Sequence, residues 1–321
     1  MSRVAVVTGS NKGIGFAIVK RLCEDFDGVV YLTSRSEHLG AAAVGKLKEQ
    51  GLRPEYHQLD VTDRQSITKF RDHLQNKHGS IDILINNAGY ASGYGNDSFE
   101  ECKKVIDINY RGVLNVQEII YPLIRRNGRV INVSSDCGHL SNVRNEEWIE
   151  RLSKQDLNIE DVNEFVDWFL ESKKNGTFKT SDFVEDGHIV AYRVSKVALC
   201  ALTLIQQKEL ESRDISVNSL HPGFVRTDMT MKIGFCTADE AAETPVYLAL
   251  HAPQSLRGAY VWHDGTTRDW HDHENALFFT LAFARSWLLT SLIANVKDYF
   301  AAWLSYLLDK LKRKPIANGA R

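Results

Sequence analysis

Residues 4–26 read VAVVTGSNKGIGFAIVKRLCEDF, and this stretch decides the fold. Its first four residues are apolar and mostly β-branched, which favours a short strand. From Phe16 to Phe26 the apolar side chains recur at helical spacing. Between these two segments lie glycines in the spacing Gly-x-x-x-Gly-x-Gly, at Gly9, Gly13 and Gly15. Because a strand, a glycine loop and a helix in this order point backbone N–H groups and a helix dipole at a phosphate, we predict a nucleotide-binding unit.

The residue after the next predicted strand indicates the kind of nucleotide. That strand covers residues 28–33 and leads into Arg35, twenty residues after Gly15. In dinucleotide-binding folds an acidic residue in this place binds the ribose 2′-hydroxyl, whereas an arginine accommodates a 2′-phosphate. Lys12, inside the glycine loop, adds a second cation. We therefore expect NADP(H) rather than NAD.

Strands and helices alternate along most of the chain. We predict strands at residues 53–59, 81–85, 129–133, 215–220 and 259–262, and helices at residues 64–78, 99–123 and 238–249. Such a β-α-β-α series is typical of a parallel sheet with helices on both faces. The predicted fold class is therefore α/β, with a doubly wound parallel sheet.

The carboxyl ends of the strands line the ligand crevice of a doubly wound sheet. Small, polar or turn-forming residues follow several predicted strands, at Asp60-Val61, Asn86-Asn87-Ala88-Gly89, Ser134-Ser135 and Pro222-Gly223. Ser135 directly follows a central strand, so its hydroxyl is a candidate donor to a substrate oxygen. Thr227, after the Pro-Gly turn, is a candidate contact to the cofactor. The plain alternative at each position is a residue that only forms a turn.

A tyrosine and a lysine form a second candidate site on a later helix. Tyr192 and Lys196 are four positions apart, so their side chains share one helical face. An ammonium beside a phenol favours the phenolate, which lets a tyrosine transfer a proton near neutral pH. The alternative is an amphipathic helix with an interfacial tyrosine and a solvated lysine. Asn109, midway along the predicted helix 99–123, is locally unfavourable there, so it either faces solvent or binds something.

The alternation is interrupted at residues 139–187. Between Ser141 and His188, twelve acidic residues stand against six basic ones. The periodicity predicts helices at residues 146–154 and 159–174. We expect a helical insert whose aromatic residues form its own small core, namely Trp148, Phe165, Trp168 and Phe169. Because such an insert disfavours a flat oligomer interface, we expect a monomeric catalytic body.

The composition argues against several classes of protein. The 321 residues carry a formal net charge of −2, which does not suggest a nucleic-acid surface. The five cysteines are odd in number and contain no C-x-x-C, so we expect neither a disulfide framework nor a metal site. The first apolar run is too short for the core of an export signal, so we expect a cytoplasmic body.

The C-terminal residues are strongly apolar. Residues 276–296 include fifteen apolar residues in 21, a length that can span a bilayer. Arg285, near the centre of this stretch, would cost about 2.5–3.5 kcal/mol in a membrane. Residues 299–311 are amphipathic and run into a basic cluster at residues 310–314, which favours a return to the cytosolic face. Three alternatives stay open: an interfacial or hairpin membrane anchor, a single span, or helices packed on the body or on a partner.

Taken together and in order, these motifs resemble the short-chain dehydrogenase/reductase family. They are the glycine loop, Asn86-Asn87-Ala88-Gly89, Asn109, Ser135, Tyr192, Lys196 and Pro222-Gly223. Within the family the chain looks most like the monomeric NADPH-dependent carbonyl reductases. That likeness rests on the opening TGSNKGIG, on residues 224–229 and 243–250, and on the 57 positions between the serine and the tyrosine. The resemblance implies a Rossmann-like fold over residues 1 to about 265.

The resemblance also implies roles for individual residues. Tyr192 would protonate the carbonyl oxygen as hydride arrives from the nicotinamide, and Ser135 would hold that oxygen. Lys196 would lower the pKa of the tyrosine and bind the ribose, with Asn109 supporting it through a water molecule. The implied cofactor-binding residues are Gly9, Asn11, Lys12, Gly13, Ile14, Gly15, Arg35, Asp60, Val61, Asn86, Tyr192, Lys196, Pro222, Gly223, Val225 and Thr227.

The implied function is NADPH-dependent reduction of aldehydes, ketones or quinones. One alternative is a dehydrogenase or reductase of a retinoid or steroid at a membrane, and another is a non-catalytic NADP-binding protein. We expect residues 90–95 and His139-Leu140 to shape the substrate pocket, and His221 to be an ordinary loop histidine. The expected organisation is a catalytic domain at residues 1–269 followed by an apolar helical extension at residues 270–321, which leaves tethering of the cytoplasmic body to a membrane as an open alternative.

Overall fold

A computed structural model of the protein describes residues 2–92, 96–184 and 189–273. The segment considered above for membrane attachment, residues 276–311, lies outside the described residues, and so do residues 93–95 of the segment expected at the substrate pocket. Within the described ranges, no helix is both long enough and apolar enough to cross a membrane.

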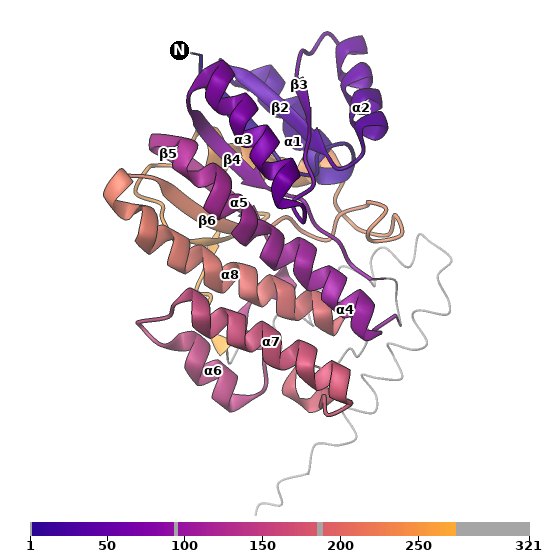
Figure 1. Cartoon of the computed structure of the whole chain (residues 1–321), viewed down its shortest axis with the longest axis vertical. Helices are drawn as coiled ribbons and strands as arrows, with labels where there is room; N and C mark the ends of the chain where they lie inside the picture. Colours follow the sequence, from indigo (N-terminus) through magenta and orange to yellow (C-terminus); the bar gives the residue numbers. More distant parts are fainter. Residues whose placement is uncertain (1, 93–95, 185–188, 274–321) are drawn as a thin grey trace, which may run out of the picture. The chain divides into compact units, whose positions relative to one another are not determined.

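In the described part of the chain, eight strands form one sheet in the order β3-β2-β1-β4-β5-β6-β7-β8 (Figure 1). The strands are β1 (Val4–Val7), β2 (Val29–Ser34), β3 (Glu55–Gln58), β4 (Ile81–Asn86), β5 (Ile124–Val133), β6 (Ser216–His221), β7 (Tyr260–Trp262) and β8 (Thr267–Arg268). Neighbours from β3 to β7 pair in parallel, whereas β8 is antiparallel to β7. The strand order reverses between β1 and β4, which is where doubly wound sheets bind ligands. The predicted fold class is confirmed.

Two layers of helices cover the two faces of this sheet. Ala5 and Val7 of β1 belong to a core shared with α1, α2 and α10. Val4 and Val6 belong to a second core shared with α3 and α5, because successive side chains of a strand point to opposite faces. The helices of these layers are α1 (Gly13–Asp25), α2 (Glu37–Glu49), α3 (Arg64–His78), α4 (Phe99–Ile106), α5 (Gly112–Ile120), α8 (Val190–Leu210), α9 (Ala238–Ala241) and α10 (Glu243–Leu250).

Two predicted helices are interrupted. The helix expected at residues 238–249 breaks between α9 and α10, because Pro245 has no N–H to donate and is tolerated only in the first turn of a new helix. The helix expected at residues 99–123 is divided between α4 and α5 by a π-helical turn, η1 (Asp107–Arg111). Asn109 lies in this turn and is fully buried, so it does not face solvent. Single π turns inside α-helices are frequent at functional sites.

The insert contains two helices, α6 (Glu146–Ser153) and α7 (Ile159–Asn175), within a residue of the predicted bounds. Its aromatic side chains pack on one another, with 5.4 Å between the ring centroids of Trp148 and Phe165. Phe165 and Phe169 are fully buried, and the Phe165 ring also lies 6.2 Å from that of Trp168, as expected for an aromatic core in the insert. Helix α7 packs against α4 and α8, below them in Figure 1. The insert therefore covers part of α8 (Val190–Leu210), the helix that carries Tyr192 and Lys196.

Candidate active site

Helix α8 places Tyr192 and Lys196 on one face. The Lys196 Nζ lies 5.5 Å from the centroid of the Tyr192 ring. The same ammonium donates a hydrogen bond of 2.7 Å to the carbonyl oxygen of Val133, the last residue of β5. Lys196 is only 4% exposed. The lysine thus joins the tyrosine helix to the carboxyl end of a central strand.

Ser135 follows the same strand and faces the tyrosine. Its Oγ donates to Asp136 Oδ1 at 2.8 Å and accepts from the Cys137 backbone N–H at 3.2 Å. Burial raises the pKa of Tyr192, nearby Cys137 and Asp136 add to the increase, and a hydrogen bond with Ser135 opposes it. The phenol is therefore protonated at neutral pH, which is the form that a general acid needs.

The ionisation of Lys196 differs from what the sequence suggested. Burial lowers the pKa of Lys196 from its usual value to about 8. The lowering of the tyrosine pKa by the lysine stays a prediction, because burial raises the pKa of Tyr192 and lowers that of Lys196, which disfavours the charged form of both groups. The lysine is consequently close to its titration point at physiological pH.

Asn109 connects α8 to the segment that follows β4. Its Oδ1 accepts from the Tyr90 backbone N–H at 2.8 Å, and its Nδ2 donates to the Tyr90 carbonyl at 2.9 Å. Nδ2 also donates to Ser195 Oγ at 2.9 Å. A Cβ added to Gly89 would lie 3.6 Å from Asn109 Oδ1 and 3.9 Å from Lys196 Nζ, so these two groups flank the same glycine. The water-mediated relay between them stays a prediction.

The glycine loop is held closely against the end of β4. Gly9 has φ +61°, and a Cβ there would lie 2.7 Å from the Ala88 Cα. A Cβ on Gly15 would lie 2.3 Å from Asn87 Nδ2. That amide donates to the Thr8 and Gly9 carbonyls at 2.9 and 3.0 Å. The loop therefore requires glycine for its shape, and it leaves a backbone cradle at the start of α1 of the kind that holds a pyrophosphate.

The two candidate cations for a 2′-phosphate lie at the carboxyl ends of β1 and β2. Arg35 is exposed directly after β2. Lys12 is the N-cap residue of α1 and forms an ion pair of 2.8 Å with Asp228. Asn11, directly before Lys12, and Ile14, in the first turn of α1, are half-buried. Both cations lie on the surface at the predicted nucleotide edge.

Three other predicted cofactor residues, Asp60, Val61 and Asn86, contact other residues of the chain. The Asp60 carboxylate accepts from the Thr62 N–H and hydroxyl at 2.9 and 2.7 Å. Val61 is 7% exposed and packs under Gly112. The Asn86 Nδ2 donates to Tyr121 Oη and Asn132 Oδ1 at 3.1 and 2.8 Å inside the core. A contact between Asn86 and the cofactor stays a prediction.

The segment after β6 approaches the glycine loop. Pro222 is buried and Gly223 has φ +87°, so the chain turns sharply at this point. Val225 is buried and forms an isolated bridge with Cys236. A Cβ added to Gly13 would lie 3.5 Å from Thr227 Cγ2. This contact places Thr227 beside the glycine loop, and its contact to the cofactor stays a prediction.

Two residues expected near the substrate pocket are buried instead. His139 is 2% exposed, and its ring nitrogens lie 2.8 Å from Ser141 Oγ and 2.8 Å from the Asp269 carbonyl. Leu140 is fully buried. The His139 ring and the Leu140 backbone N–H, which donates to the Trp270 carbonyl at 3.4 Å, hold the start of the insert against the chain near residue 270.

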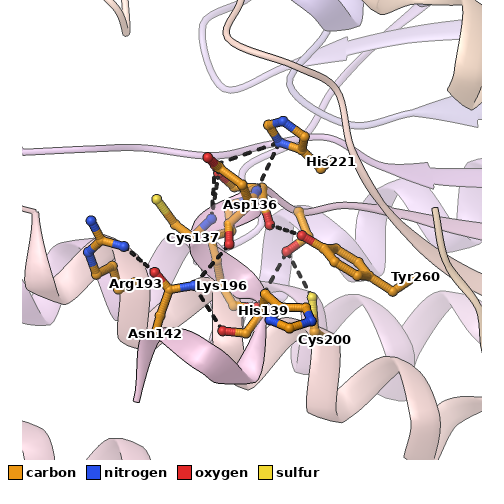
Figure 2. A network of polar contacts seen from close by, with 11 residues as sticks. Asp136, Cys137, His139, Asn142, Arg193, Lys196, Cys200, His221 and Tyr260 are labelled. Atoms are coloured by element: carbon orange, nitrogen blue, oxygen red, sulfur yellow. Dashed lines mark hydrogen bonds and ion pairs between the residues drawn. The ribbon is translucent and has the colours of Figure 1, made fainter. Parts of the chain in front are cut away.

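The structure adds Asp136 and His221 to the site (Figure 2). His221 was expected to be a loop histidine, but it is the last residue of β6 and is 6% exposed. Its Nδ1 accepts a hydrogen bond of 2.8 Å from the Asp136 backbone N–H. Burial lowers the pKa of His221, which agrees with an unprotonated Nδ1. The only sequence signal was that Asp136 follows the candidate serine and His221 ends a strand.

The chain is similar to a family model, to individual relatives and to a solved structure. A family model described as short chain dehydrogenase matches residues 3–146 and 181–235. The unmatched residues between these ranges contain all of α7 and most of α6, so the model passes over the helices of the insert.

Individual relatives extend the similarity over 79–80% of the chain. Carbonyl reductase (NADPH) 3 of Mus musculus is 39% identical over 262 residues, 79% of this chain and 93% of the relative. Carbonyl reductase (NADPH) 1 of Bos taurus is 38% identical over 264 residues, 80% of this chain and 94% of the relative. The structure of salutaridine reductase from Papaver somniferum superposes with a TM-score of 0.75 at 33% identity, covering 80% of this chain and 99% of that one.

Proposed function

Because the chain belongs to the short-chain dehydrogenase family, we propose that it reduces carbonyl compounds to alcohols with NADPH as the hydride donor. One observation carries the proposal: a protonated Tyr192 phenol, the Ser135 hydroxyl and a buried Lys196 meet at the carboxyl end of β5. This edge of the sheet also carries the glycine loop. The relatives named carbonyl reductase (NADPH) support the same chemistry.

Three side chains would act on the carbonyl group. Bound NADPH supplies the hydride that adds to the carbonyl carbon. Tyr192 gives its phenolic proton to the carbonyl oxygen as negative charge develops there. Ser135 donates a hydrogen bond to the same oxygen and positions it. Lys196, in its charged form, stabilises the tyrosinate left behind and donates to the ribose.

The glycine loop and its two cations would hold the cofactor. The contacts of Gly9 and Gly15 leave no space for side chains, so backbone N–H groups can approach a pyrophosphate. Lys12 and Arg35 are exposed at the carboxyl ends of the first two strands, where a 2′-phosphate would lie. No acidic residue takes the place of Arg35 directly after β2. This arrangement favours NADP(H) over NAD.

A second candidate substrate class is an apolar lipid such as a retinoid or steroid. Two exposed methionines favour it, Met229 at 47% and Met231 at 57% exposure. Both lie in the segment that approaches the glycine loop, where flexible apolar side chains suit an irregular apolar ligand. The substrate panel below includes this class.

The catalytic body is proposed to be monomeric and cytoplasmic. Helix α7 covers α4 and α8, which leaves less of their surface for a second copy. Static light scattering on the purified chain tests the oligomeric state, and a dimer at micromolar concentration would contradict the proposal. Attachment of residues 276–311 to a membrane stays a prediction, which flotation of the full chain with liposomes would test.

The deciding experiment is NADPH oxidation by the purified full chain with quinones, aromatic aldehydes, steroids and retinal. We expect turnover with quinones and aldehydes, and turnover confined to the lipids would favour the second class. Tyr192→Phe should lose nearly all turnover while still binding NADPH. Full activity in Tyr192→Phe would exclude the tyrosine as the acid. NADPH binding without turnover of any compound would favour the non-catalytic alternative.

A further inference from the structure

The carboxylate of Asp136 lies directly beside the hydroxyl that would hold the substrate. Ser135 Oγ donates to Asp136 Oδ1 at 2.8 Å. A carbonyl oxygen bound to Ser135 would lie about 2.8 Å from the same Oγ. The two distances together place that oxygen within about 5.6 Å of the Asp136 carboxylate. A substituent on the neighbouring carbon of the substrate can therefore reach the carboxylate.

The backbone and side chain of Asp136 are both held in place (Figure 2). Its N–H donates to His221 Nδ1 at 2.8 Å, and its carbonyl accepts from Asn142 Nδ2 at 2.9 Å. Its Oδ1 also accepts from the Cys137 N–H at 2.9 Å. Yet the side chain is 32% exposed, so part of the carboxylate is accessible. The residue is thus a fixed negative group that a ligand can touch.

The carboxylate is charged at neutral pH. Burial by itself raises the pKa of Asp136, and His221, the Ser135 hydroxyl, Arg193 and the Cys137 N–H together bring it below its usual value. The hydrogen bonds from the Ser135 hydroxyl and the Cys137 N–H stabilise the charged carboxylate whether or not His221 is protonated. Arg193 is the nearby cation, and its guanidinium also donates to Asn142 Oδ1.

Substrate binding changes the hydrogen bonds that Asp136 can make. A hydroxyl group has one proton to donate, so Ser135 cannot serve Asp136 and a carbonyl oxygen equally well. When Ser135 turns to the carbonyl, Asp136 Oδ1 loses its hydroxyl donor. Asp136 Oδ1 still accepts from the Cys137 N–H, and a hydroxyl on the substrate can replace the second donor that was lost.

We propose that Asp136 determines substrate specificity: it favours carbonyl compounds with a hydroxyl on the carbon next to the carbonyl and disfavours those with a carboxylate there. The inference rests on the proposed reductase function. A substrate carboxylate would meet a like charge at short range in a partly desolvated site, where charge repulsion is strong. A substrate hydroxyl would instead donate to Asp136 Oδ1 in place of the Ser135 hydroxyl, which then donates to the carbonyl oxygen.

Three phenyl ketones that differ at one position test the proposal. They are acetophenone, 2-hydroxyacetophenone and phenylglyoxylate. The readout is kcat/KM for the hydroxy ketone divided by kcat/KM for the keto acid, in the wild type and in Asp136→Asn. Intrinsic reactivity cancels when the two ratios are compared. We expect Asp136→Asn to lower the ratio about tenfold, since it keeps an Oδ1 acceptor but removes the charge.

Control variants make the result specific. Asp239→Asn removes an exposed carboxylate on α9 that pairs with Lys20 at 3.9 Å, and it should leave the ratio at the wild-type value. Asp136→Ser is the second variant in case Asp136→Asn does not fold, and it should shift the ratio in the same direction. A ratio within about twofold of wild type in the Asp136 variants would overturn the inference.

The outcomes also separate this inference from the proposed function. If the wild type turns over quinones or aldehydes but the ratio does not move, only the specificity inference fails. If none of the three ketones is turned over, they are measured as competitive inhibitors of quinone reduction, and the ratio of inhibition constants is compared in the same way. Absence of NADPH oxidation with every compound would instead refute the reductase function.

Discussion

The ammonium of Lys12 and the carboxylate of Asp228 form an ion pair of 2.8 Å that joins the glycine loop to the segment after β6. Both side chains are more than half exposed, at 66% and 59%. Exposed pairs of this kind contribute little to stability. This ion pair matters for cofactor binding instead. Asp228 competes with the 2′-phosphate for Lys12, the residue proposed to bind that phosphate.

Removal of that competitor should tighten cofactor binding. Asp228→Asn frees Lys12 for the 2′-phosphate, so we expect the Kd for NADPH to fall about threefold at low salt, and the effect to shrink as salt is added. Fluorescence titration with NADPH measures it. Lys12→Ala in the same titration should weaken binding. If Asp228→Asn binds NADPH more weakly than the wild type, Asp228 supports cofactor binding and does not compete with the 2′-phosphate for Lys12.

The charge after β2 should select the cofactor. Arg35→Asp replaces the exposed cation with an acid that can bind a ribose 2′-hydroxyl and repel a 2′-phosphate. We expect the ratio of kcat/KM for NADPH to that for NADH to fall by about a hundredfold, in keeping with the loss of a charge-assisted contact and the gain of a repulsive one. Steady-state kinetics with both cofactors check this. Arg53→Asp, an exposed arginine before β3, serves as the matched control.

Reduction should decline in mildly alkaline solution. Burial lowers the pKa of Lys196 to about 8, so the fraction of charged lysine falls as the pH rises through that value. Tyr192 does not limit this range, because burial raises its pKa and keeps the phenol protonated. We expect kcat/KM to be constant at pH 6–7 and to fall above about pH 8. A flat profile up to pH 9.5 would mean that the charge of Lys196 is not required.

Mild acid should destabilise the fold through a histidine pair on α3. Tyr31 Oη lies 2.9 Å from both His73 Nε2 and His78 Nε2. Burial lowers the pKa of His73 and His78, and positive neighbours add to the decrease. Between the unfolded pKa of about 6.5 and the lower folded values, the unfolded chain binds more protons, so the free energy of unfolding falls as the pH decreases.

Thermal unfolding at pH 7.5 and at pH 5 measures this effect. We expect a lower Tm at pH 5 in the wild type and a smaller difference in the double variant His73→Gln with His78→Gln, whose amides do not titrate but still bond to Tyr31. An unchanged pH dependence in the double variant would assign acid sensitivity to other groups.

Trp270 should belong to the catalytic body although it lies just past the predicted domain boundary. It is 4% exposed, and its Nε1 donates to the Gly138 carbonyl at 2.7 Å. A chain that ends at residue 273 should therefore unfold at a higher temperature than one that ends at residue 269, by the equivalent of about 3 kcal/mol for a buried tryptophan. Equal Tm values for the two chains would show that the tryptophan adds nothing.

Much of the predicted nucleotide-binding unit could be predicted because the sequence patterns that indicate it are short and local. A β-branched run, a glycine loop and an amphipathic helix lie within 23 consecutive residues, 4–26, and β1 was placed with its observed bounds. Helix α2 was missed, since Gly40 and Gly45 weaken its helical pattern. The structure explains Gly40, because a Cβ there would lie 2.0 Å from the Tyr56 ring on β3.

What the sequence could not show about the site depends on contacts between distant residues. Alternation along β4 turns the Asn86 side chain toward Tyr121 and Asn132, 35 and 46 positions away. A π turn buries Asn109 and directs it to Ser195, 86 positions away. Asp136 and His221 meet across 85 positions because β5 and β6 are neighbours in the sheet. Contacts between residues this far apart in the sequence cannot be predicted from a local sequence pattern.

The sequence by itself determined the family, the order of strands β1 to β7, the glycine loop and the spacing of Tyr192 and Lys196, because each depends on residues close together in the chain. Only the tertiary structure decided which side chains face the crevice and how they ionise. Burial keeps the Tyr192 phenol protonated and brings Lys196 close to neutral pH, and burial depends on what the rest of the fold places around a group.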